Sequence, residues 1–583
     1  MKNDKNTKNN PVFTWKIGGI AGGGQQVAGL IFTKACVHGG LYTFDSSEYP
    51  SRIRGGLVTY RVSIGQEPVN SIYQKNQLLI ALTREAFEYC LADVAAEGVI
   101  LYDSDEFEIK ADEANGKKIY PLPLEKLAKE AGIKSIASNI IITGACTALL
   151  DYDLEILNEV IKETFAGKGE EVVAMNLTAA KFGYDYAKKN LDADKFPYKL
   201  KAQGKNDQSI VVTANDTICL AAVACGCKFF SAYPMTPASS ILQILAGWAL
   251  KTDMVVKHPE DEISAMHMAI GAAYAGVRSM TCTSGGGFAL MNEGLSLAGI
   301  TETPLVIIES QRPGPATGLP TWTEQGDLAY VVNSGHGEFL RVVLAPGDPT
   351  EAFYLTTQAF NLAEKYQIPV FVLVDKYISE GHESIVEPDL AKFEINRGKL
   401  LTEADLAKIT DYQRYQITAD GVSPRAIPGQ AGGVHLVNSD EHDEFGFTIE
   451  GFTPEIRNQM AKKRAAKLAG ILADLPKPEL FGPAIAKLTL VGWGSVKGPV
   501  LEALKSLTDV NYLHLAAPWP LDSATMKVAV KGAKKLVSIE NNQTAQLANL
   551  LQQATGISVD QRLTKYNGAQ FFPEEIVELV GKL

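Results

Sequence analysis

The sequence predicts a multidomain α/β protein. Its 583 residues are too many for one hydrophobic core, and the length favours about three to four domains. Short apolar runs typical of buried strands alternate with segments of helical period. Four loops between positions 233 and 321 follow such strands and are rich in Gly, Pro and polar residues. Ligands bind at strand-end loops in open α/β sheets, so we expect the functional site there.

The composition excludes several classes of function. With 46% hydrophobic and 21% charged residues the chain is typical of globular proteins, and a net charge of -12 argues against nucleic-acid binding. No apolar run approaches the length of a membrane span, and the polar first ten residues do not resemble a signal peptide. The seven scattered cysteines favour reduced thiols and a cytoplasmic location over a disulfide or metal framework.

The first α/β domain is expected over residues 1–195. A short strand at 14–17 leads into a glycine-rich turn and a helix, a combination whose backbone N–H groups suit a phosphate. Val27 stands where a dinucleotide fingerprint needs its third glycine, so a plain strand–helix turn is an equally good interpretation. The apolar run at 140–144 reads as another buried strand, and the basic loop at 49–56 suits either an anion or solvent.

Residues 196–208 read as a linker, because they are charged and have no apolar period. The next domain, 209–390, opens with a strand at 210–212. A second strand then runs into Pro234. Pro234 and Pro237 bracket Thr236 and hold its hydroxyl in one place, where it suits a carboxylate, although an ST-turn is the competing interpretation.

An alanine-rich helix is expected to begin at Glu262, directly after a strand and Pro259. A carboxylate in a first helical turn is stabilised by the helix dipole by roughly 0.3–1 kcal/mol. The helix dipole alone is enough to explain a glutamate at position 262. Whether Glu262 has a catalytic role is decided by the surrounding motifs.

That context resembles a known family. A glutamate starting an alanine-rich helix, followed by Thr-Ser-Gly-x-Gly at 283–287, resembles the pyrimidine-binding domain of thiamine diphosphate enzymes. The motifs Tyr-Pro-Met-Thr-Pro and Gln-Arg-Pro-Gly-Pro-Ala-Thr-Gly-Leu-Pro-Thr narrow the match to 2-oxoacid:ferredoxin oxidoreductases, as an alpha subunit with the gamma domain fused at its N-terminus. The runs Glu-Gln-Gly-Asp-Leu and Glu-His-Asp-Glu-Phe-Gly continue the match, at 324–328 and 441–446. The resemblance covers nearly the whole chain.

Two positions depart from the family pattern. Gly286 stands where the family usually has proline, which implies a looser loop over the cofactor. Ala238 lengthens the family's Thr-Pro-Ser-Ser run by one residue, which leaves Thr236 in place and the register of the two serines open.

The resemblance implies the fold of each part of the chain. Residues 1–195 would be a gamma-type catalytic domain, and 209–390 a thiamine diphosphate-binding domain of pyrimidine type. Residues 481–583 would be an α/β domain like the C-terminal domain of transketolase, with 391–480 a linker or excursion. The acidic run around His442 lacks a regular ligand geometry, so a solvated loop or an interface is favoured there, and no metal ligand is predicted in this chain.

The chain lacks two motifs that a complete enzyme of this kind needs. Neither Gly-Asp-Gly followed by Asn-Asn nor a Cys-x-x-Cys-x-x-Cys run is present. The resemblance therefore implies a beta subunit that holds Mg²⁺, the diphosphate half of the site and a [4Fe–4S] cluster. It also implies an (αβ)₂ heterotetramer built from heterodimers, ferredoxin as the electron acceptor and CoA as a co-substrate.

The resemblance also assigns residues to roles. Glu262 would be catalytic, by hydrogen-bonding N1′ of the cofactor's aminopyrimidine. The expected substrate-binding residues are Thr236, Arg312 and Tyr233. The expected cofactor-binding residues are Glu262, Thr283, Ser284, Gly285 and Gly287. The expected CoA-binding residues are Gly22, Gly24, Gln26, Arg52 and Arg54.

The implied reaction is CoA-dependent oxidative decarboxylation of a 2-oxoacid, with electrons passed to ferredoxin. The fused arrangement most resembles members that act on 2-oxoglutarate. Pyruvate and branched-chain 2-oxoacids remain alternatives for the substrate. A transketolase-like transferase is disfavoured by the absent Mg²⁺ motif and the fused N-terminal domain, and a non-catalytic assembly subunit by the intact Glu262, Thr236 and Arg312.

Overall fold

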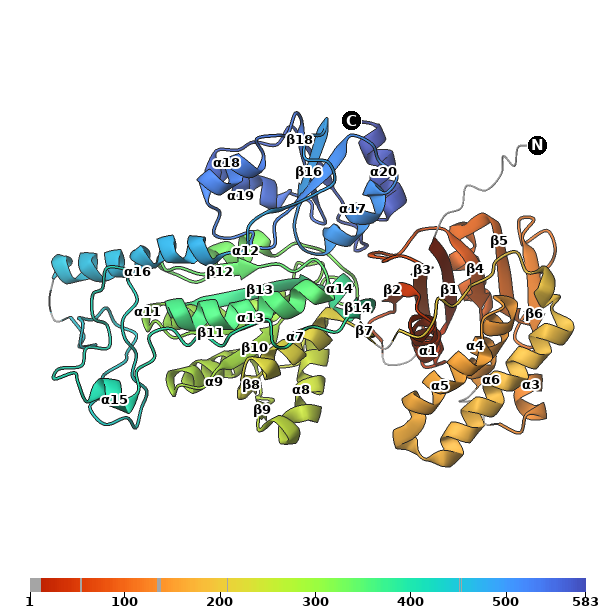
Figure 1. The fold of residues 1–583 in the computed structure, drawn as a ribbon, viewed down its shortest axis with the longest axis horizontal. Helices are drawn as coiled ribbons and strands as arrows, with labels where there is room; N and C mark the ends of the chain where they lie inside the picture. The colour runs from red at the N-terminus through yellow and green to blue at the C-terminus, as the bar shows by residue number, and fades with distance from the viewer. Residues whose placement is uncertain (1–11, 53–54, 134–137, 207, 450, 452) are drawn as a thin grey trace. The chain divides into compact units, whose positions relative to one another are not determined.

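The computed structural model describes residues 12–52, 55–133, 138–206, 208–449, 451 and 453–583. These residues form two compact units (Figure 1). The first unit contains the described residues up to Val212, together with Gly381–Glu387 and Phe572–Leu583. The second unit contains Thr213–Glu380 and Pro388–Phe571. No helix in the described part of the chain has both the length and the apolar character that crossing a membrane requires.

The first unit is built on a mixed eight-stranded sheet with the order β6-β5-β4-β1-β3-β2-β14-β7. β1 lies inside it, antiparallel to β3 over nine residue pairs and parallel to β4. The main core packs the sheet against the helices α1, α4, α5 and α6. The elements of this unit are β1 (Val12–Ile20), α1 (Gln25–His38), β2 (Tyr42–Glu48), β3 (Leu57–Gly65), β4 (Asn76–Ala81), α2 (Arg84–Cys90), β5 (Val94–Asp103), β6 (Lys118–Leu122), α3 (Leu124–Glu130), α4 (Ser138–Leu149), α5 (Leu154–Phe165), α6 (Glu170–Asn190), β7 (Ser209–Val212), β14 (Glu383–Val386) and α20 (Pro573–Gly581).

The apolar run at 140–144 is a helix, so the prediction of a strand there is wrong. It lies inside α4, which is buried on nearly all sides and packs closely on α6. A Cβ on Gly144 would lie 2.0 Å from Ala180 O, and one on Gly183 would lie 1.9 Å from Ile141 O. The glycines therefore let two helices touch backbone to backbone. A short apolar run buried on all sides has no periodicity that separates helix from strand.

Two short strands complete the far edge of the first sheet. Ser209–Val212, which the sequence assigns to the start of the second domain, forms β7 and pairs antiparallel with β14 over four residues. β14 also touches β2 through Glu383 and Phe44. Asp45 of β2 accepts hydrogen bonds from the backbone N–H of His382 at 2.9 Å and from the Tyr60 hydroxyl. The first unit thus includes a stretch from the middle of the chain.

The second unit contains a six-stranded parallel sheet with the order β12-β13-β11-β10-β8-β9. Helix α13 packs against β11 and β13 and against α7, whereas α9 packs against β8 and β10 and α11 against β13. The elements are α7 (Ala214–Ala224), β8 (Phe229–Ser231), α8 (Ser239–Thr252), β9 (Val255–Lys257), α9 (Glu262–Tyr274), β10 (Ser279–Thr283), α10 (Gly285–Phe288), α11 (Asn292–Ile300), β11 (Leu305–Gln311), α12 (Leu328–Asn333), β12 (Val342–Leu344), α13 (Pro349–Tyr366), β13 (Pro369–Asp375) and α14 (Lys376–Glu380).

A five-stranded sheet, β15-β17-β16-β18-β19, forms the C-terminal part of the second unit. One hydrophobic core joins it to the six-stranded sheet, because Val491 and Trp493 pack with Phe371 and Leu373. The two α/β layers of this unit are therefore one packed body. The elements are β15 (Glu479–Phe481), β16 (Leu488–Gly492), α17 (Lys497–Leu504), β17 (Val510–His514), α18 (Ser523–Ala529), β18 (Leu536–Glu540), α19 (Gln546–Thr555) and β19 (Gln561–Thr564).

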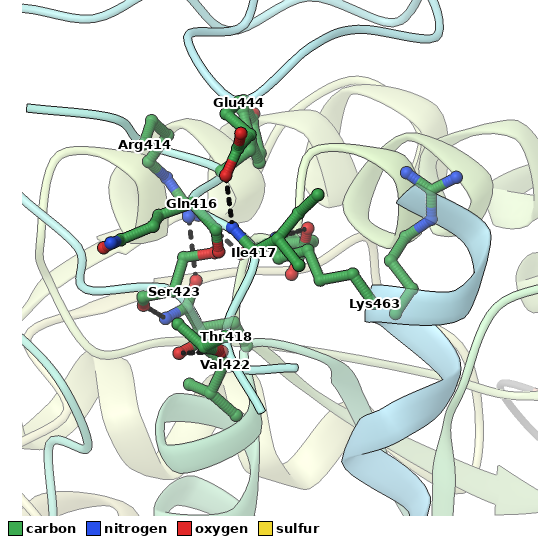
Figure 2. Close-up of polar contacts among 12 residues, drawn as sticks. Arg414, Gln416, Ile417, Thr418, Val422, Ser423, Glu444 and Lys463 are labelled. Atoms are coloured by element: carbon green, nitrogen blue, oxygen red, sulfur yellow. Dashed lines mark hydrogen bonds and ion pairs between the residues drawn. The ribbon is translucent and has the colours of Figure 1, made fainter. Parts of the chain in front are cut away.

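The segment that lies between these two sheets in the sequence contains α15 (Glu403–Leu406) and the long helix α16 (Pro454–Asp474). Buried ion pairs hold α16, since Glu302 is paired with Lys463 at 2.5 Å and with Lys467 at 2.6 Å. Figure 2 shows the loop beside it, where the Glu444 carboxylate accepts a hydrogen bond from the backbone N–H of Ile417 at 2.7 Å. The excursion is therefore an ordered layer fixed by polar contacts.

Candidate functional site

The carboxyl ends of four parallel strands meet along one edge of the six-stranded sheet. β8 leads to the loop with Tyr233, β9 leads to the start of α9 at Glu262, β10 ends at Thr283, and β11 leads to the loop with Arg312. Because all four strands run in the same direction, the sheet brings these loops to one edge, where ligands bind in folds of this kind. The predicted site residues of this half are thus gathered by the fold.

Helix α9 begins as the sequence predicts, at Glu262. Asp261 is its N-cap, and the Asp261 carboxylate accepts a hydrogen bond from the backbone N–H of Ser264 at 2.7 Å. The Glu262 side chain is only 4% exposed, and no hydrogen bond from a described residue reaches its carboxylate. The Glu262 carboxylate is therefore available to accept a hydrogen bond from a ligand.

The loop after β10 lies against this carboxylate. A Cβ on Gly287 would stand 2.6 Å from Glu262 Oε1 and 2.3 Å from Thr283 Oγ1. The hydroxyl of Ser284 is buried and has no hydrogen-bond partner among the described residues. Gly286 has open space, with Ala316 O at 3.8 Å as its only neighbour. The structure therefore brings four of the predicted cofactor residues together and shows why Gly287 must lack a side chain.

The two residues predicted to hold a substrate carboxylate are in direct contact. Arg312 Nη1 donates to the backbone carbonyl of Thr236 at 2.8 Å, and both residues are half-buried. One guanidinium donor is thus used to orient the side chain. Tyr233 lies at the rim, 37% exposed, with its ring 5.8 Å from the ring of His258.

The C-terminal sheet braces the loop that follows Arg312, a feature that sequence reasoning missed. The Gln325 side chain donates to Trp493 O at 2.8 Å and accepts from Asn541 N at 2.9 Å. The Gln546 side chain donates to Gly326 O at 2.7 Å and accepts from Ala329 N at 2.8 Å. These amides fix the backbone on both sides of Asp327.

Sequence reasoning also missed two fully buried carboxyl groups, Glu309 and Asp375, and the half-buried carboxyl of Asp327. Glu309 on β11 is fully buried, and burial raises its pKa well above the ordinary value. Burial raises the pKa of Asp327 to about 6 and that of Asp375 to about 6. An acidic residue inside an apolar strand is the only sequence signal for such a group.

The predicted CoA loop in the first unit has the shape of an anion-binding turn. Gly22 and Gly24 adopt left-handed backbone conformations, with φ of 87° and 81°, and Gly24 caps α1 without a side-chain hydrogen bond. Gln25 turns back to donate to Ile20 O at 2.9 Å, which leaves Gln26 exposed. Arg52 is exposed, and Arg54 lies outside the described residues.

The acidic run at 441–444 contacts helix α16 through ion pairs. Glu441 pairs with Arg457 at 2.6 Å and with Arg464 at 2.9 Å on α16. His442 is fully buried, with its ring 3.9 Å from the ring of Tyr415. Within the described residues no group of three or more His, Cys, Asp or Glu side chains is placed to hold a metal ion.

The residues around Glu262 fit the aminopyrimidine half of thiamine diphosphate. Ser284 supplies a buried hydroxyl without a partner, Glu262 supplies a carboxylate on a side chain that is 4% exposed, and Gly287 supplies the space next to that carboxylate. Together with the parallel sheet, these features define a protein of the thiamine diphosphate-binding class.

Comparison with known proteins agrees with that class. Residues 220–462 match the family model "Pyruvate flavodoxin/ferredoxin oxidoreductase, thiamine diP-bdg", and residues 14–186 match "Pyruvate ferredoxin/flavodoxin oxidoreductase". The chain is 32% identical to the alpha subunit of 2-oxoacid:ferredoxin oxidoreductase 2 from Aeropyrum pernix, over 97% of each chain. It is 31% identical to 2-oxoglutarate synthase subunit KorA from Methanothermobacter thermautotrophicus, over 64% of this chain and 98% of that one.

A solved structure resembles the whole chain. It is the 2-oxoglutarate:ferredoxin oxidoreductase from Magnetococcus marinus with 2-oxoglutarate, coenzyme A and succinyl-CoA bound, with a TM-score of 0.91 and 31% identity over 98% of this chain and 99% of that one. The chain belongs to the 2-oxoacid:ferredoxin oxidoreductase family. The predicted fold class and family are thereby confirmed.

Proposed function

We propose that this chain is the alpha subunit, with a fused gamma domain, of an enzyme that oxidises 2-oxoglutarate to succinyl-CoA and CO₂ and reduces ferredoxin. The observation that carries the proposal is the unpartnered, buried Glu262 against Gly287, beside the contact between Arg312 and Thr236. The 2-oxoglutarate, coenzyme A and succinyl-CoA bound in the Magnetococcus marinus structure support the choice of 2-oxoacid. The reduced, buried cysteines fit a cytoplasmic enzyme.

Three residues, Glu262, Arg312 and Thr236, act in this mechanism. The chemistry that thiamine diphosphate supplies when bound is nucleophilic attack on the 2-oxo carbon and an electron sink for decarboxylation. The Glu262 carboxylate would hold the cofactor's aminopyrimidine by accepting a hydrogen bond, and would keep a proton at its N1′. Arg312 uses its remaining N–H donors for the 1-carboxylate of the substrate, as charge-assisted hydrogen bonds. Thr236 orients Arg312 through its carbonyl and presents its hydroxyl to the same carboxylate.

A beta subunit would complete the site with Mg²⁺, the diphosphate-binding residues and a [4Fe–4S] cluster, in an (αβ)₂ assembly that passes electrons to ferredoxin. Large apolar side chains that are exposed next to the site residues suit such a partner. They are Tyr233 in the loop after β8, and Ile263 and Met268 on α9.

We expect the isolated chain to be inactive and to bind thiamine diphosphate weakly, because it supplies only the aminopyrimidine half of the site. Titration calorimetry of the chain with thiamine diphosphate, with and without Mg²⁺, measures this directly. Micromolar, Mg²⁺-dependent binding by the chain alone would contradict the proposal that this chain supplies only half of the cofactor site. The matched control is the same titration on the complex with the beta subunit.

We expect the assembled enzyme to prefer 2-oxoglutarate to pyruvate and 2-oxoisovalerate. Arg312 accounts for the carboxylate that all three share, so discrimination arises at the far end of the pocket. Comparison of kcat/KM for the three acids, with ferredoxin or a viologen as acceptor, is the measurement. A preference for 2-oxoisovalerate by about tenfold, which corresponds to about 1.4 kcal/mol, would show that the assignment of 2-oxoglutarate is wrong. The proposed class of reaction would be unaffected.

The glycine loop of the first unit is the proposed site for the CoA phosphates, through Gly22, Gly24, Gln26, Arg52 and Arg54. The left-handed glycines and the uncapped start of α1 leave backbone N–H groups available for an anion. We expect CoA to slow hydrogen exchange of the amides between Gly22 and Gly29 in the assembled complex. Unchanged exchange in this segment, with protection elsewhere, would move the CoA site to another part of the enzyme.

A further inference from the structure

The segment 325–329, which leads into helix α12, is held by side chains from two sheets. On the side of the six-stranded sheet, Gln311 is the last residue of β11, and its Oε1 accepts a hydrogen bond from the backbone N–H of Asp327 at 3.0 Å. On the side of the five-stranded sheet, Gln325 and Gln546 make the contacts. The segment therefore ties the two sheets of the second unit together.

Gln325 belongs to the segment and is fully buried. Its backbone N–H donates to Asn541 O at 2.7 Å, and its side-chain Oε1 accepts from Asn541 N at 2.9 Å. Its side-chain Nε2 donates to Trp493 O at 2.8 Å. Asn541 directly follows β18, so these three hydrogen bonds fix the start of the segment on the C-terminal sheet.

Gln546 is the first residue of α19, and its side chain binds the segment on both sides of Asp327. Its Nε2 donates to Gly326 O at 2.7 Å, and its Oε1 accepts from Ala329 N at 2.8 Å. Because these two backbone positions flank Asp327, Gln546 fixes the backbone from which the Asp327 side chain projects.

The Asp327 carboxyl group packs on the loop after β10. A Cβ on Gly285 would lie 2.5 Å from Asp327 Oδ2 and 2.9 Å from Asp327 Cγ, which is closer than a side chain can approach. Gly285 belongs to residues 283–287, the cofactor loop, in which Gly287 lies against Glu262 Oε1. A continuous series of contacts therefore runs from the five-stranded sheet through Asp327 to the cofactor loop.

We propose that Gln325 and Gln546 are positioning residues for thiamine diphosphate: by fixing Asp327 they hold the cofactor loop, before the cofactor binds, in the form that accepts the aminopyrimidine. The loop is then ordered on folding, and binding does not have to supply that order. If the loop were ordered in only a fraction of the molecules, the apparent Kd would rise by the inverse of that fraction. This inference deepens the proposed function and rests on its assignment of residues 283–287 to the cofactor.

Titration calorimetry of the complex with the beta subunit, in the presence of Mg²⁺, tests the positioning role. Gln546→Ala removes both hydrogen bonds of the side chain, so we expect the Kd for thiamine diphosphate to rise by at least about fivefold, with the number of sites unchanged. The matched control is Gln543→Ala, an exposed glutamine just before α19, which should keep the Kd within about twofold of wild type. An unchanged Kd in Gln546→Ala overturns the proposal, and so does a loss of sites at unchanged Kd, which a purely structural role would produce.

The route through Asp327 is tested by a double-mutant cycle on the same Kd. Asp327→Ala removes the contact with Gly285 and should itself weaken binding. In this background Gln546→Ala should change the Kd by less than about twofold, because the contact through which Gln546 acts is already lost. Effects that multiply independently would show that Gln546 acts by another route and would overturn the proposal.

Hydrogen exchange of the cofactor-free complex measures the order of the loop directly. The backbone N–H groups of Phe288 and Ala289 donate to Ser284 O and Gly285 O. We expect these two amides to exchange at least about fivefold faster in Gln546→Ala than in Gln543→Ala, and equal exchange contradicts the proposal. A complex that shows these effects on thiamine diphosphate binding but does not oxidise 2-oxoglutarate refutes the proposed function and leaves this inference standing.

Discussion

Glu262→Gln should reduce kcat of the assembled enzyme by at least about 100-fold, in the range expected for loss of an acid–base group. The amide has nearly the shape of the carboxylate, so the variant should fold and assemble. It cannot, however, hold a proton at the aminopyrimidine N1′ as a carboxylate does. Steady-state turnover with a viologen acceptor, together with gel filtration of the complex, separates the two effects.

Glu260→Gln is the matched control for that variant. Glu260 is exposed and lies before the N-cap Asp261, outside α9. Its loss should change turnover by less than about twofold, as expected for a surface charge. If Glu260→Gln were the severe variant and Glu262→Gln the mild one, the catalytic carboxylate would be Glu260 and the assignment of Glu262 would be wrong.

Gly287→Ala should be nearly as damaging, with a loss of turnover of about 100-fold from misplacement of the reacting groups. The added methyl would lie 2.6 Å from Glu262 Oε1 and 2.3 Å from Thr283 Oγ1, so one of these side chains must move. The same kinetic assay measures the effect, and thermal unfolding shows whether the fold survives.

The neighbouring glycine provides the control. A methyl on Gly286 meets only Ala316 O, at 3.8 Å, and the position has an ordinary backbone conformation. Gly286→Ala should therefore retain most of the activity. Equal losses in the two variants would mean that the flexibility of the loop matters and that the space next to Glu262 does not. The control also probes the position where the family usually has proline.

The start of α9 could be predicted because its signals are local. Asp261 is a favourable N-cap, the following residues have helical period, and Pro259 excludes an earlier start. The gathering of Glu262, Thr283, Thr236 and Arg312 followed from the rule that parallel strands end at one edge. The contact between Arg312 and Thr236 O, in contrast, depends on how two loops fold and has no local signal.

Buried charges could not be predicted, because their partners are distant in sequence. Lys463 and Lys467 look like the solvated face of α16, yet both are paired with Glu302, which lies far earlier in the chain. Glu309 has the same difficulty, since a single acidic residue in an apolar strand does not reveal that its side chain is fully buried. The sequence predicts a strand at 140–144 because only the fold shows that this run belongs to a helix covered by α6.

The first unit is built from segments that lie far apart in the sequence, and this affects how it folds during synthesis. β14 is translated only after all six strands of the six-stranded sheet have been made, and α20 is the last helix of the chain. Domains generally fold from the N-terminus as they leave the ribosome. Here the edge of β2 in the nascent N-terminal sheet must wait unpaired until β14 has been made, and the sheet gains α20 later still.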